Sequence, residues 1–324
     1  FWNFDVRDRT LGNDNAPRMA VAGPLISMVE RPQLDLGDPP IIRIDTIEDG
    51  LTLVARLLDR NPDYIKVWFI HRERDSLTAQ EAIVKAAGDA AHAAGKKLAV
   101  HATELVVAKA AMRAGADFLV HSVFDQPVDD EFIALARARN VVYCPTLFVT
   151  MGYPLALSNL WRATPEELVR ADPQILAAMD DLNEIPREKL PERFAALLKD
   201  AKPPAPPAIA MQNLRKVLDA GITVVMGTDA GNIGTLHGPS ILREMRLMQD
   251  SGLTPLEVLR ASTTNGAQVL GLAGKTGLIA PGMLADLVLL DADPLADTGN
   301  VGKVYRVIKN GVVYEPEKLM EAIR

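Results

Sequence analysis

The sequence has almost no cysteine and no long apolar run. Its 324 residues include a single cysteine, Cys144, which excludes an internal disulfide and says little about the compartment. A lone cysteine in an apolar run is usually part of a hydrophobic core. No apolar run approaches the roughly 20 residues that a membrane-spanning helix needs. The sequence therefore predicts neither a disulfide framework nor a membrane span.

Clusters of positive charge are also missing. Lys and Arg total 35 against 42 Asp and Glu, which gives a formal net charge of -7. Without a polybasic run, this balance argues against a nucleic-acid partner. The other residues are those of a globular protein, with 48% hydrophobic and 24% charged side chains. A chain of this length can form one large barrel or two domains.

An initiator methionine and a secretory signal are absent as well. The chain opens on Phe1 and Trp2, and no signal-peptide pattern follows. We expect the sequence to begin inside a longer polypeptide. The compartment stays open on this basis: cytoplasmic, or periplasmic or secreted if a signal peptide lies upstream of Phe1.

The stretch from Leu98 to Val123 contains a strand–helix–strand pattern. Two short apolar runs each end in a histidine, His101 and His121, as is typical of strands buried on both faces of a parallel sheet. Between them, Glu104–Ala114 is rich in helix-forming residues and stops at a glycine. Active sites of parallel barrels lie at the carboxyl ends of the strands. Two imidazoles on neighbouring strands there can share one metal ion.

Helix and strand patterns alternate along the rest of the chain. Strands are expected where apolar, aromatic or β-branched residues are concentrated, at Arg18–Gly23, Tyr64–Ile70, Val141–Phe148 and Ile222–Asp229. Helices are expected over Thr46–Leu58, Leu77–Ala94, Asp129–Arg139, Ile209–Leu218, Leu242–Asp250 and Pro255–Leu270. The alternation predicts an α/β fold with a parallel sheet.

Three segments interrupt this alternation. Phe1–Asn15 is irregular or the remains of a helix, and Leu34–Pro40 is a loop rich in Gly, Pro and Asp. Gly152–Pro207 carries many Pro, Asp and Glu residues. A long insertion after a barrel strand is either a lid or specificity loop or a surface excursion.

Two further polar residues lie in or directly after predicted strands. Strand alternation places Lys66 on the face opposite Ile65 and Val67. Because lysine is rarely buried unless it is paired or neutralised, Lys66 either points into the barrel or reaches water at the strand end. Asp229 lies within Gly227–Gly231, where small residues let a ligand or metal approach the backbone, although an aspartate there can also cap a turn.

The pattern changes to short strands and turns from Lys275 onward. Strands are expected at Gly277–Gly282, Ala285–Asp291 and Val304–Tyr314. The last of these contains Asn310 and Gly311, a dipeptide that favours a β-hairpin. We therefore divide the chain into a body of residues 1–272 and a small β unit with a terminal helix, residues 273–324.

These segments resemble the metal-dependent amidohydrolase superfamily, in the branch that includes imidazolonepropionase and the carboxylated-lysine Xaa-Pro dipeptidases. The resemblance covers most of the chain, at Asp63–Val67, Ala91–Gly95, Val100–Ala102, Ala114–His121, Cys144–Leu147, Gly227–Gly231 and Gly277–Asp291. It implies an α/β fold with a (β/α)8 TIM barrel, of which this sequence carries strands three to eight. The tail would form the C-terminal part of a small β-sandwich.

The family's first barrel strand ends in a His-x-His pair, and this sequence contains no such pair. Six strands cannot close an eight-stranded barrel without the other two. We expect the missing strands and the pair to lie upstream of Phe1. The alternatives are that another chain supplies them or that this polypeptide is inactive.

The resemblance also implies a binuclear metal centre. It makes Lys66 a carboxylated bridging ligand, His101 and His121 ligands of one metal, and Asp229 a ligand of the other. Carboxylation turns a cation that is costly to bury into an anion that binds metal. Two divalent ions would share an attacking hydroxide, and Asp229 would pass its proton to the leaving amine. Zinc suits nitrogen and oxygen ligands, with manganese or cobalt as alternatives.

The resemblance predicts a metal-dependent hydrolase that cleaves an amide or peptide bond of a small substrate, such as a dipeptide or an N-acyl amino acid. His237, Tyr143 and Arg72 are candidate substrate-binding residues, although an ordinary loop position for His237 is nearly as well supported. A cyclic amide, lactone or ester hydrolase and an inactive barrel acting as a binding module are the alternatives. We also expect a homo-oligomer. A nucleotide-binding protein is disfavoured because Gly227–Gly231 lacks a phosphate-loop fingerprint.

Overall fold

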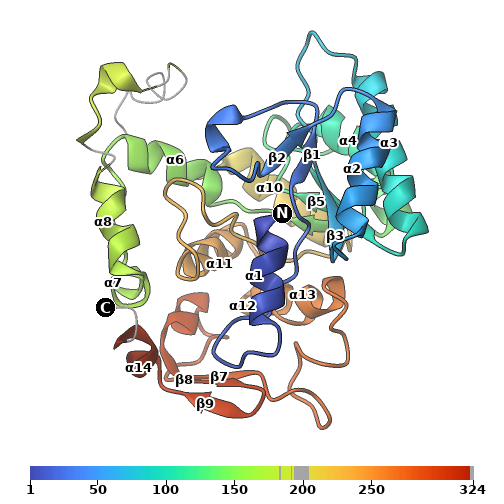
Figure 1. Cartoon of the computed structure of the whole chain (residues 1–324). Helices are drawn as coiled ribbons and strands as arrows, with labels where there is room; N and C mark the ends of the chain where they lie inside the picture. Colours follow the sequence, from blue (N-terminus) through green and yellow to red (C-terminus); the bar gives the residue numbers. More distant parts are fainter. Residues whose placement is uncertain (182–183, 191, 193–203, 322–324) are drawn as a thin grey trace. The chain divides into compact units, whose positions relative to one another are not determined.

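The computed structural model describes residues 1–181, 184–190, 192 and 204–321 (Figure 1). The chain forms two compact units. The first unit comprises Phe1–Pro145, Lys216–Val225 and Gln268–Gly271, and the second comprises Thr146–Arg215, Met226–Ala267 and Leu272–Arg324. None of the helices in the described part of the chain is long and apolar enough to cross a membrane.

A six-stranded parallel sheet forms the centre of the first unit. Its strands run in the order β2-β1-β3-β4-β5-β6. Their bounds are β1 (Leu25–Ser27), β2 (Ile41–Arg43), β3 (Tyr64–Trp68), β4 (Lys97–His101), β5 (Phe118–Val120) and β6 (Val142–Cys144). All five pairings are parallel, so every connection has to cross over from one end of the sheet to the other.

Helices provide the crossovers from β2 onward. They are α2 (Ile47–Leu58), α3 (Leu77–Ala93), α4 (Leu105–Arg113) and α5 (Asp130–Arg139). Figure 1 shows α2, α3 and α4 side by side along the sheet, and each of them contacts the next. The predicted strand–helix–strand pattern around the two histidines is therefore confirmed, with helix bounds within a few residues of those expected.

Local sequence signals explain where these helices begin. Thr46 caps α2: its hydroxyl accepts a hydrogen bond from the amide of Asp49, whose side chain bonds back to the Thr46 amide. The Ser76 hydroxyl accepts from the Ala79 amide at the start of α3, and the Asp129 carboxylate accepts from the Phe132 amide at the start of α5. Each cap satisfies a backbone amide that has no partner within the helix.

In the first unit, one predicted strand is absent and one observed strand was not predicted. Arg18–Gly23 forms no strand, and β1 begins only at Leu25. Gly23 has φ +80°, and a proline without an amide hydrogen follows it, so a regular strand cannot run through this point. The loop predicted at Leu34–Pro40 is present, with η1 (Pro32–Leu34) at its start, but it leads into β2, a strand that was not expected.

The later strands are shorter than predicted. Val141–Phe148 yields only β6, which ends directly before Pro145 because proline cannot donate a ladder hydrogen bond. Ile222–Asp229 contributes a single bridge, between Val224 and Tyr143. The Val225 amide still donates to the carbonyl of Tyr143, but the ladder ends there because the Met226 amide donates to the carbonyl of Ala261 instead. The expectation of a full strand at Ile222–Asp229 is therefore wrong.

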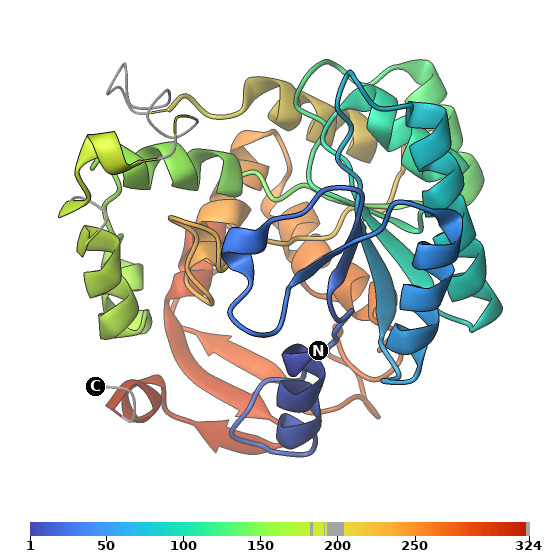
Figure 2. The same ribbon diagram turned by 45° about the horizontal axis from the view of Figure 1, so that its top comes forward.

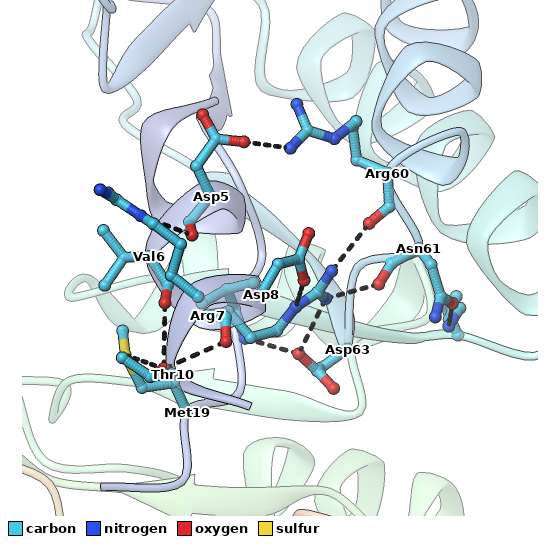
Figure 3. Close-up of polar contacts among 12 residues, drawn as sticks. Asp5, Val6, Arg7, Asp8, Thr10, Met19, Arg60, Asn61 and Asp63 are labelled. Carbon is cyan, nitrogen blue, oxygen red and sulfur yellow. Dashed lines mark hydrogen bonds and ion pairs between the residues drawn. The ribbon is translucent and has the colours of Figure 1, made fainter. Parts of the chain in front are cut away.

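The first residues form a helix, α1 (Trp2–Thr10), which packs within the first unit. Phe4 is fully buried, and a Cβ on Gly23 would lie 2.6 Å from its ring. The Arg7 guanidinium donates hydrogen bonds to the carbonyls of Arg60 and Asn61, and Arg60 pairs with Asp5 (Figure 3). These contacts hold α1 against the loop that leads into β3. This loop lies at the amino end of the parallel strands, whereas His101 lies at the carboxyl end of β4.

The second unit combines helices with a small antiparallel sheet. Its helices are α6 (Val149–Leu157), α7 (Pro165–Arg170), α8 (Pro173–Asp181), α11 (Ser240–Asp250), α12 (Pro255–Ser262) and α14 (Pro316–Glu321), with the 3-10 turns η3 (Arg187–Lys189) and η4 (Thr298–Gly302). Two further helices, α10 (Ala208–Asp219) and α13 (Thr264–Val269), each have residues in both units. The sheet has the order β7-β8-β9, with β7 (Leu287–Leu290), β8 (Val304–Lys309) and β9 (Val312–Tyr314), drawn in red in Figure 2.

The predicted hairpin in the C-terminal tail is confirmed, whereas a continuous helix over Pro255–Leu270 and a strand at Gly277–Gly282 are not found. Asn310 and Gly311 have φ +51° and +84°, as a tight hairpin turn requires, and join β8 to β9. The helix expected over Pro255–Leu270 is interrupted at Thr263, which has non-helical dihedral angles. No strand forms at Gly277–Gly282. Part of the Gly152–Pro207 insertion lies outside the described residues, and the described part forms short helices joined by irregular segments.

Candidate metal centre

Lys66 lies on the face of the first unit's sheet opposite to that of Ile65 and Val67. In β3, Ile65 and Val67 are buried on one side, whereas Lys66 is only partly buried on the other. Ala99 of β4 lies directly beside Lys66, and His101 lies beside Trp68. Side chains of paired residues in a parallel sheet point to the same face. Lys66, Trp68 and His101 therefore share one face.

A backbone turn brings His121 to His101. Val120 pairs with His101 in the sheet, so regular alternation would send the next side chain to the opposite face. His121 instead has φ +78°, a value that is uncommon outside glycine. Its amide donates to the carbonyl of Cys144 at the end of β6, which holds the turn in place. The two imidazole rings consequently meet edge to face, with centroids 4.4 Å apart.

The surroundings of both histidines keep the rings neutral. Burial, followed by the positive charge of Lys66, lowers the pKa of His101 to about 3. Burial, followed by the charges of His101 and Lys66, lowers the pKa of His121 well below its usual value. Both residues keep part of their surface exposed. A neutral imidazole with access to solvent is the form that binds a metal ion.

Trp68 completes this group of side chains and was missed in the sequence. Its indole ring lies edge to face against His101, with centroids 5.7 Å apart. The guanidinium of Arg31 stands 5.1 Å from the centre of the Trp68 ring, within the range of a cation–π contact. The sequence offered one signal for Trp68: it lies two residues after Lys66 in the same strand, and side chains at i and i+2 of a strand share a face.

Asp229 lies in a tight turn of the second unit. Its backbone has φ +55°, and its carbonyl accepts a hydrogen bond from the side-chain amide of Asn232, 2.9 Å away. The Tyr153 hydroxyl of α6 donates to the same Asn232 side chain, so α6 anchors the turn. Asp229 itself is exposed. Non-glycine residues with positive φ are strained and recur at functional sites.

His237 lies against the same turn. Its Nε2 is 3.0 Å from the position that a Cβ on Gly231 would occupy, and Gly231 has φ +98°. Only glycine lets the imidazole approach the backbone this closely. His237 is exposed and belongs, with Asp229, to the second unit.

Tyr143 and Arg72 are placed differently from each other. Tyr143 is 1% exposed, and its hydroxyl accepts a hydrogen bond from the amide of Val123. Burial raises the pKa of this phenol to about 12. This arrangement makes Tyr143 a support for the loop after β5, beside His121, instead of a side chain open to substrate. Arg72 is partly exposed in the loop between β3 and α3, as expected.

These residues fit a metal centre in part. Among the described residues, no group of three or more His, Cys, Asp and Glu side chains could hold a metal ion. The first unit supplies two neutral imidazoles in contact, with a lysine whose charge acts on both. A cationic lysine there repels a metal, whereas a carboxylated lysine would add anionic oxygen ligands. The donor set therefore suits zinc or a similar divalent ion if Lys66 is carboxylated.

Comparison with known sequences points in the same direction. A family model described as "Amidohydrolase family" matches residues 42–314. The imidazolonepropionase of Ralstonia nicotianae is 38% identical over 109 residues, which cover 33% of this chain and 24% of that protein. The ochratoxinase of Aspergillus niger is 35% identical over 81 residues, 25% of this chain and 16% of that protein. The matches thus span a quarter or less of these curated relatives.

Comparison with solved structures covers nearly the whole chain. A Xaa-Pro dipeptidase with bound methionine in the active site has a TM-score of 0.69 at 22% identity, over 96% of this chain and 71% of that one. Ochratoxinase of A. niger has a TM-score of 0.65 at 20% identity, over 97% and 70% of the two chains. Identities this low show the fold alone. The predicted fold class is confirmed as TIM-barrel-like α/β with a small antiparallel sheet at the C-terminus.

Proposed function

The chain belongs to the amidohydrolase family, and from this premise we propose that it is a metal-dependent hydrolase of C–N bonds in small substrates. The preferred substrates in this proposal are dipeptides and N-acyl amino acids. What supports it most is the contact between the neutral imidazoles of His101 and His121, at the carboxyl ends of adjacent parallel strands. His121 has φ +78°, a backbone conformation that is uncommon outside glycine and that recurs at functional sites.

In this proposal, the residues of the candidate site bind metal, transfer a proton or contact the substrate. His101 and His121 would present ring nitrogens to a divalent ion, and a carboxylated Lys66 would add anionic oxygen ligands. Bound ions would polarise the substrate carbonyl and lower the pKa of the attacking water. Asp229 would hold a second ion, accept the proton of the water and deliver it to the leaving amine. His237 and Arg72 would contact the substrate.

The substrate class is inferred from the neighbours. One solved neighbour is named for Xaa-Pro dipeptides and another for ochratoxin. A second candidate reaction, the opening of a cyclic amide, is favoured by the match to imidazolonepropionase, which has 38% identity. Both reactions need the same metal-binding residues and differ in the shape of the substrate.

Metal content and carboxylation test the proposal together with activity. We expect the purified protein to contain about two divalent ions per chain and to hydrolyse members of a panel of dipeptides, N-acyl amino acids, cyclic amides and lactones. Labelled bicarbonate should give a carbamate signal in the 13C NMR spectrum of the wild type. Lys66→Arg, which keeps the charge but cannot be carboxylated, should lose the signal, one or both ions and the activity.

Three results would contradict the proposal. A protein that binds no metal and hydrolyses nothing in the panel would be the inactive binding module. Full activity in Lys66→Arg would exclude the carboxylated lysine. Hydrolysis of lactones or esters without any amide would replace the proposed reaction with the alternative one.

A further inference from the structure

The first unit carries an arginine, in cation–π contact with a tryptophan beside the candidate metal ligands, that no metal-binding role explains. We propose that Arg31, which lies on the ring of Trp68 next to His101, binds the carboxylate of the substrate and so selects anionic substrates. This inference rests on the proposed function and specifies the part of the site that recognises the carboxylate on the leaving-amine side of the cleaved bond.

A buried hydroxyl fixes the segment before Arg31 to the end of β3. Ser27, the last residue of β1, is fully buried and pairs with Trp68 in the sheet. Its hydroxyl donates to the carbonyl of Trp68, 2.9 Å away, and accepts from the amide of Val29 at 3.1 Å. The chain after β1 therefore leaves the sheet at a defined angle, with Arg31 only two residues beyond Val29.

Trp68 connects Arg31 to the candidate metal centre. The indole is on the same face as Lys66 and touches the ring of His101 edge to face. Arg31 and His101 therefore contact the same aromatic ring. A single small molecule bound near His101 would reach Arg31 along the indole.

A cation–π contact holds the Arg31 side chain beside the indole. The guanidinium carbon stands 5.1 Å from the centre of the Trp68 ring. The N–H groups of a guanidinium lie in its plane, where a carboxylate is bound by two parallel hydrogen bonds. One terminal nitrogen donates weakly to the carbonyl of Glu30, at 3.4 Å. The residue is partly exposed, so a ligand can approach it. A side chain that is already held by an aromatic ring loses less entropy on binding.

The covalent structure of the proposed substrates matches this arrangement. In an N-acyl amino acid or a dipeptide, the carboxylate is attached to the carbon next to the amide nitrogen. With the amide carbonyl near His101 and His121, the carboxylate must lie a short distance to one side. Trp68 and Arg31 occupy the side of His101 that faces β3 and β1, so the carboxylate would be bound there.

The test compares a carboxylate with its neutral counterpart. The probes are an N-methylsulfonyl amino acid, whose sulfonamide replaces the amide bond that the enzyme would cleave, and its primary carboxamide, titrated calorimetrically into the metal-loaded protein. We expect Arg31→Gln to weaken binding of the carboxylate by about 10- to 100-fold, as for a lost hydrogen bond to a charged group, and to leave binding of the carboxamide unchanged. Arg31→Lys should retain part of the affinity because it keeps the charge but loses the paired hydrogen bonds.

A matched arginine and a spectroscopic signal control the test. Arg43 ends the neighbouring β2, is exposed and pairs with Asp45, so Arg43→Gln should bind both probes as the wild type does. The carboxylate should also change the tryptophan fluorescence, and Trp68→Phe should lose this change although Trp2 and Trp161 remain. Circular dichroism and metal content should be the same in all variants.

The outcomes separate this inference from the proposed function. Three results would overturn the role of Arg31. In Arg31→Gln, the affinity for both probes falls equally, or the affinity for neither probe falls. Alternatively, the wild type does not bind the carboxylate at all. If the wild type hydrolyses amides and Arg31→Gln is equally active on anionic substrates, the proposed hydrolase activity is supported and the role of Arg31 is not. Carboxylate binding that depends on Arg31, without hydrolysis of any amide, would support the arginine and contradict the hydrolase.

Discussion

At the scale of single residues, the sequence identifies the side chains of the candidate site but not the backbone that directs them. His101 and His121 each follow an apolar run, and both were expected at strand ends. Their contact depends on φ +78° at His121, and no residue type in Val120–Ser122 signals a positive φ. Arg31 and Trp68 carry no motif of their own. Their contact follows from the pairing of β1 with β3, which the wrong placement of the first strand concealed.

Glu244 is a buried residue that sequence patterns could not reveal. It lies in the middle of the amphipathic helix α11 and is fully buried. Its two carboxylate oxygens accept hydrogen bonds of 2.8 Å from the amides of Leu147 and Phe148, in the segment that follows β6 and starts α6. These bonds stabilise the charged form, but burial has the larger effect and raises the pKa of Glu244 to about 7.

This shift predicts a pH dependence of stability. Between the usual pKa of glutamate and about 7, the folded protein binds the proton and the unfolded chain does not. Protonated Glu244 therefore stabilises the folded state. This stabilisation is complete below the pKa of glutamate in the unfolded chain and is lost as the pH rises through 7. The free energy of unfolding changes by an amount of the order of 3 kcal/mol. Glu244→Gln, which cannot titrate, should remove this part of the slope in denaturant unfolding measured from pH 5 to 8.

The control for Glu244 is an exposed glutamate. Glu48 lies on the surface of α2, and Glu48→Gln should leave the slope of the wild type in place. Parallel stability curves for Glu244→Gln and the wild type would show that the carboxyl group titrates normally, and the assigned pKa of about 7 would be wrong.

At the scale of elements, capped amphipathic helices were predicted best. The capping box at Thr46 and the apolar spacing that follows it place α2 within a residue. Strands were predicted less well, because their ends depend on partners that are distant in the sequence. Ile222–Asp229 has the composition of a strand, yet its ladder ends after Val225, where the Met226 amide turns to Ala261. A single interruption at Thr263 divides a helix that the apolar pattern continues through.

The cap of α2 gives a prediction at this scale. Thr46→Ala removes the hydroxyl that accepts from the Asp49 amide and should lower the free energy of unfolding by about 1 kcal/mol. Thr52→Ala makes the same substitution at an exposed position inside the same helix, where alanine has the higher helix propensity. It should leave the stability unchanged or raise it slightly. Equal effects of the two substitutions, measured by urea unfolding, would show that the cap contributes nothing.

At the scale of the whole molecule, the family resemblance predicted the fold class, and the residues alone predicted little of the division into units. Residues assigned to the candidate site belong to both units: Lys66, His101 and His121 to the first, Asp229 and His237 to the second. The predicted boundary at residue 272 between a barrel and a C-terminal part stays a prediction, as does the homo-oligomer. Contacts between residues far apart in the sequence decide these features, and a single sequence does not contain them.

Metal binding should be visible in the stability of the molecule as a whole. A ligand that binds only the folded state raises the free energy of unfolding, by about 2.7 kcal/mol at a concentration of 100 times Kd. We therefore expect added zinc to raise the Tm of the metal-free wild type and chelation to reverse the shift. His101→Ala should abolish most of the shift, because the two adjacent imidazoles can no longer bind one ion together.

A second histidine distinguishes a specific site from general metal binding. His92 lies on the exposed side of α3 and pairs with Asp117, 2.8 Å away, outside the candidate metal centre. His92→Ala should keep the full zinc shift, although it loses the same ring as His101→Ala. An equal loss of the shift in both variants would mean that zinc binds surface histidines indiscriminately. No shift in the wild type would mean that the imidazole pair, as it stands in this chain, does not hold the ion.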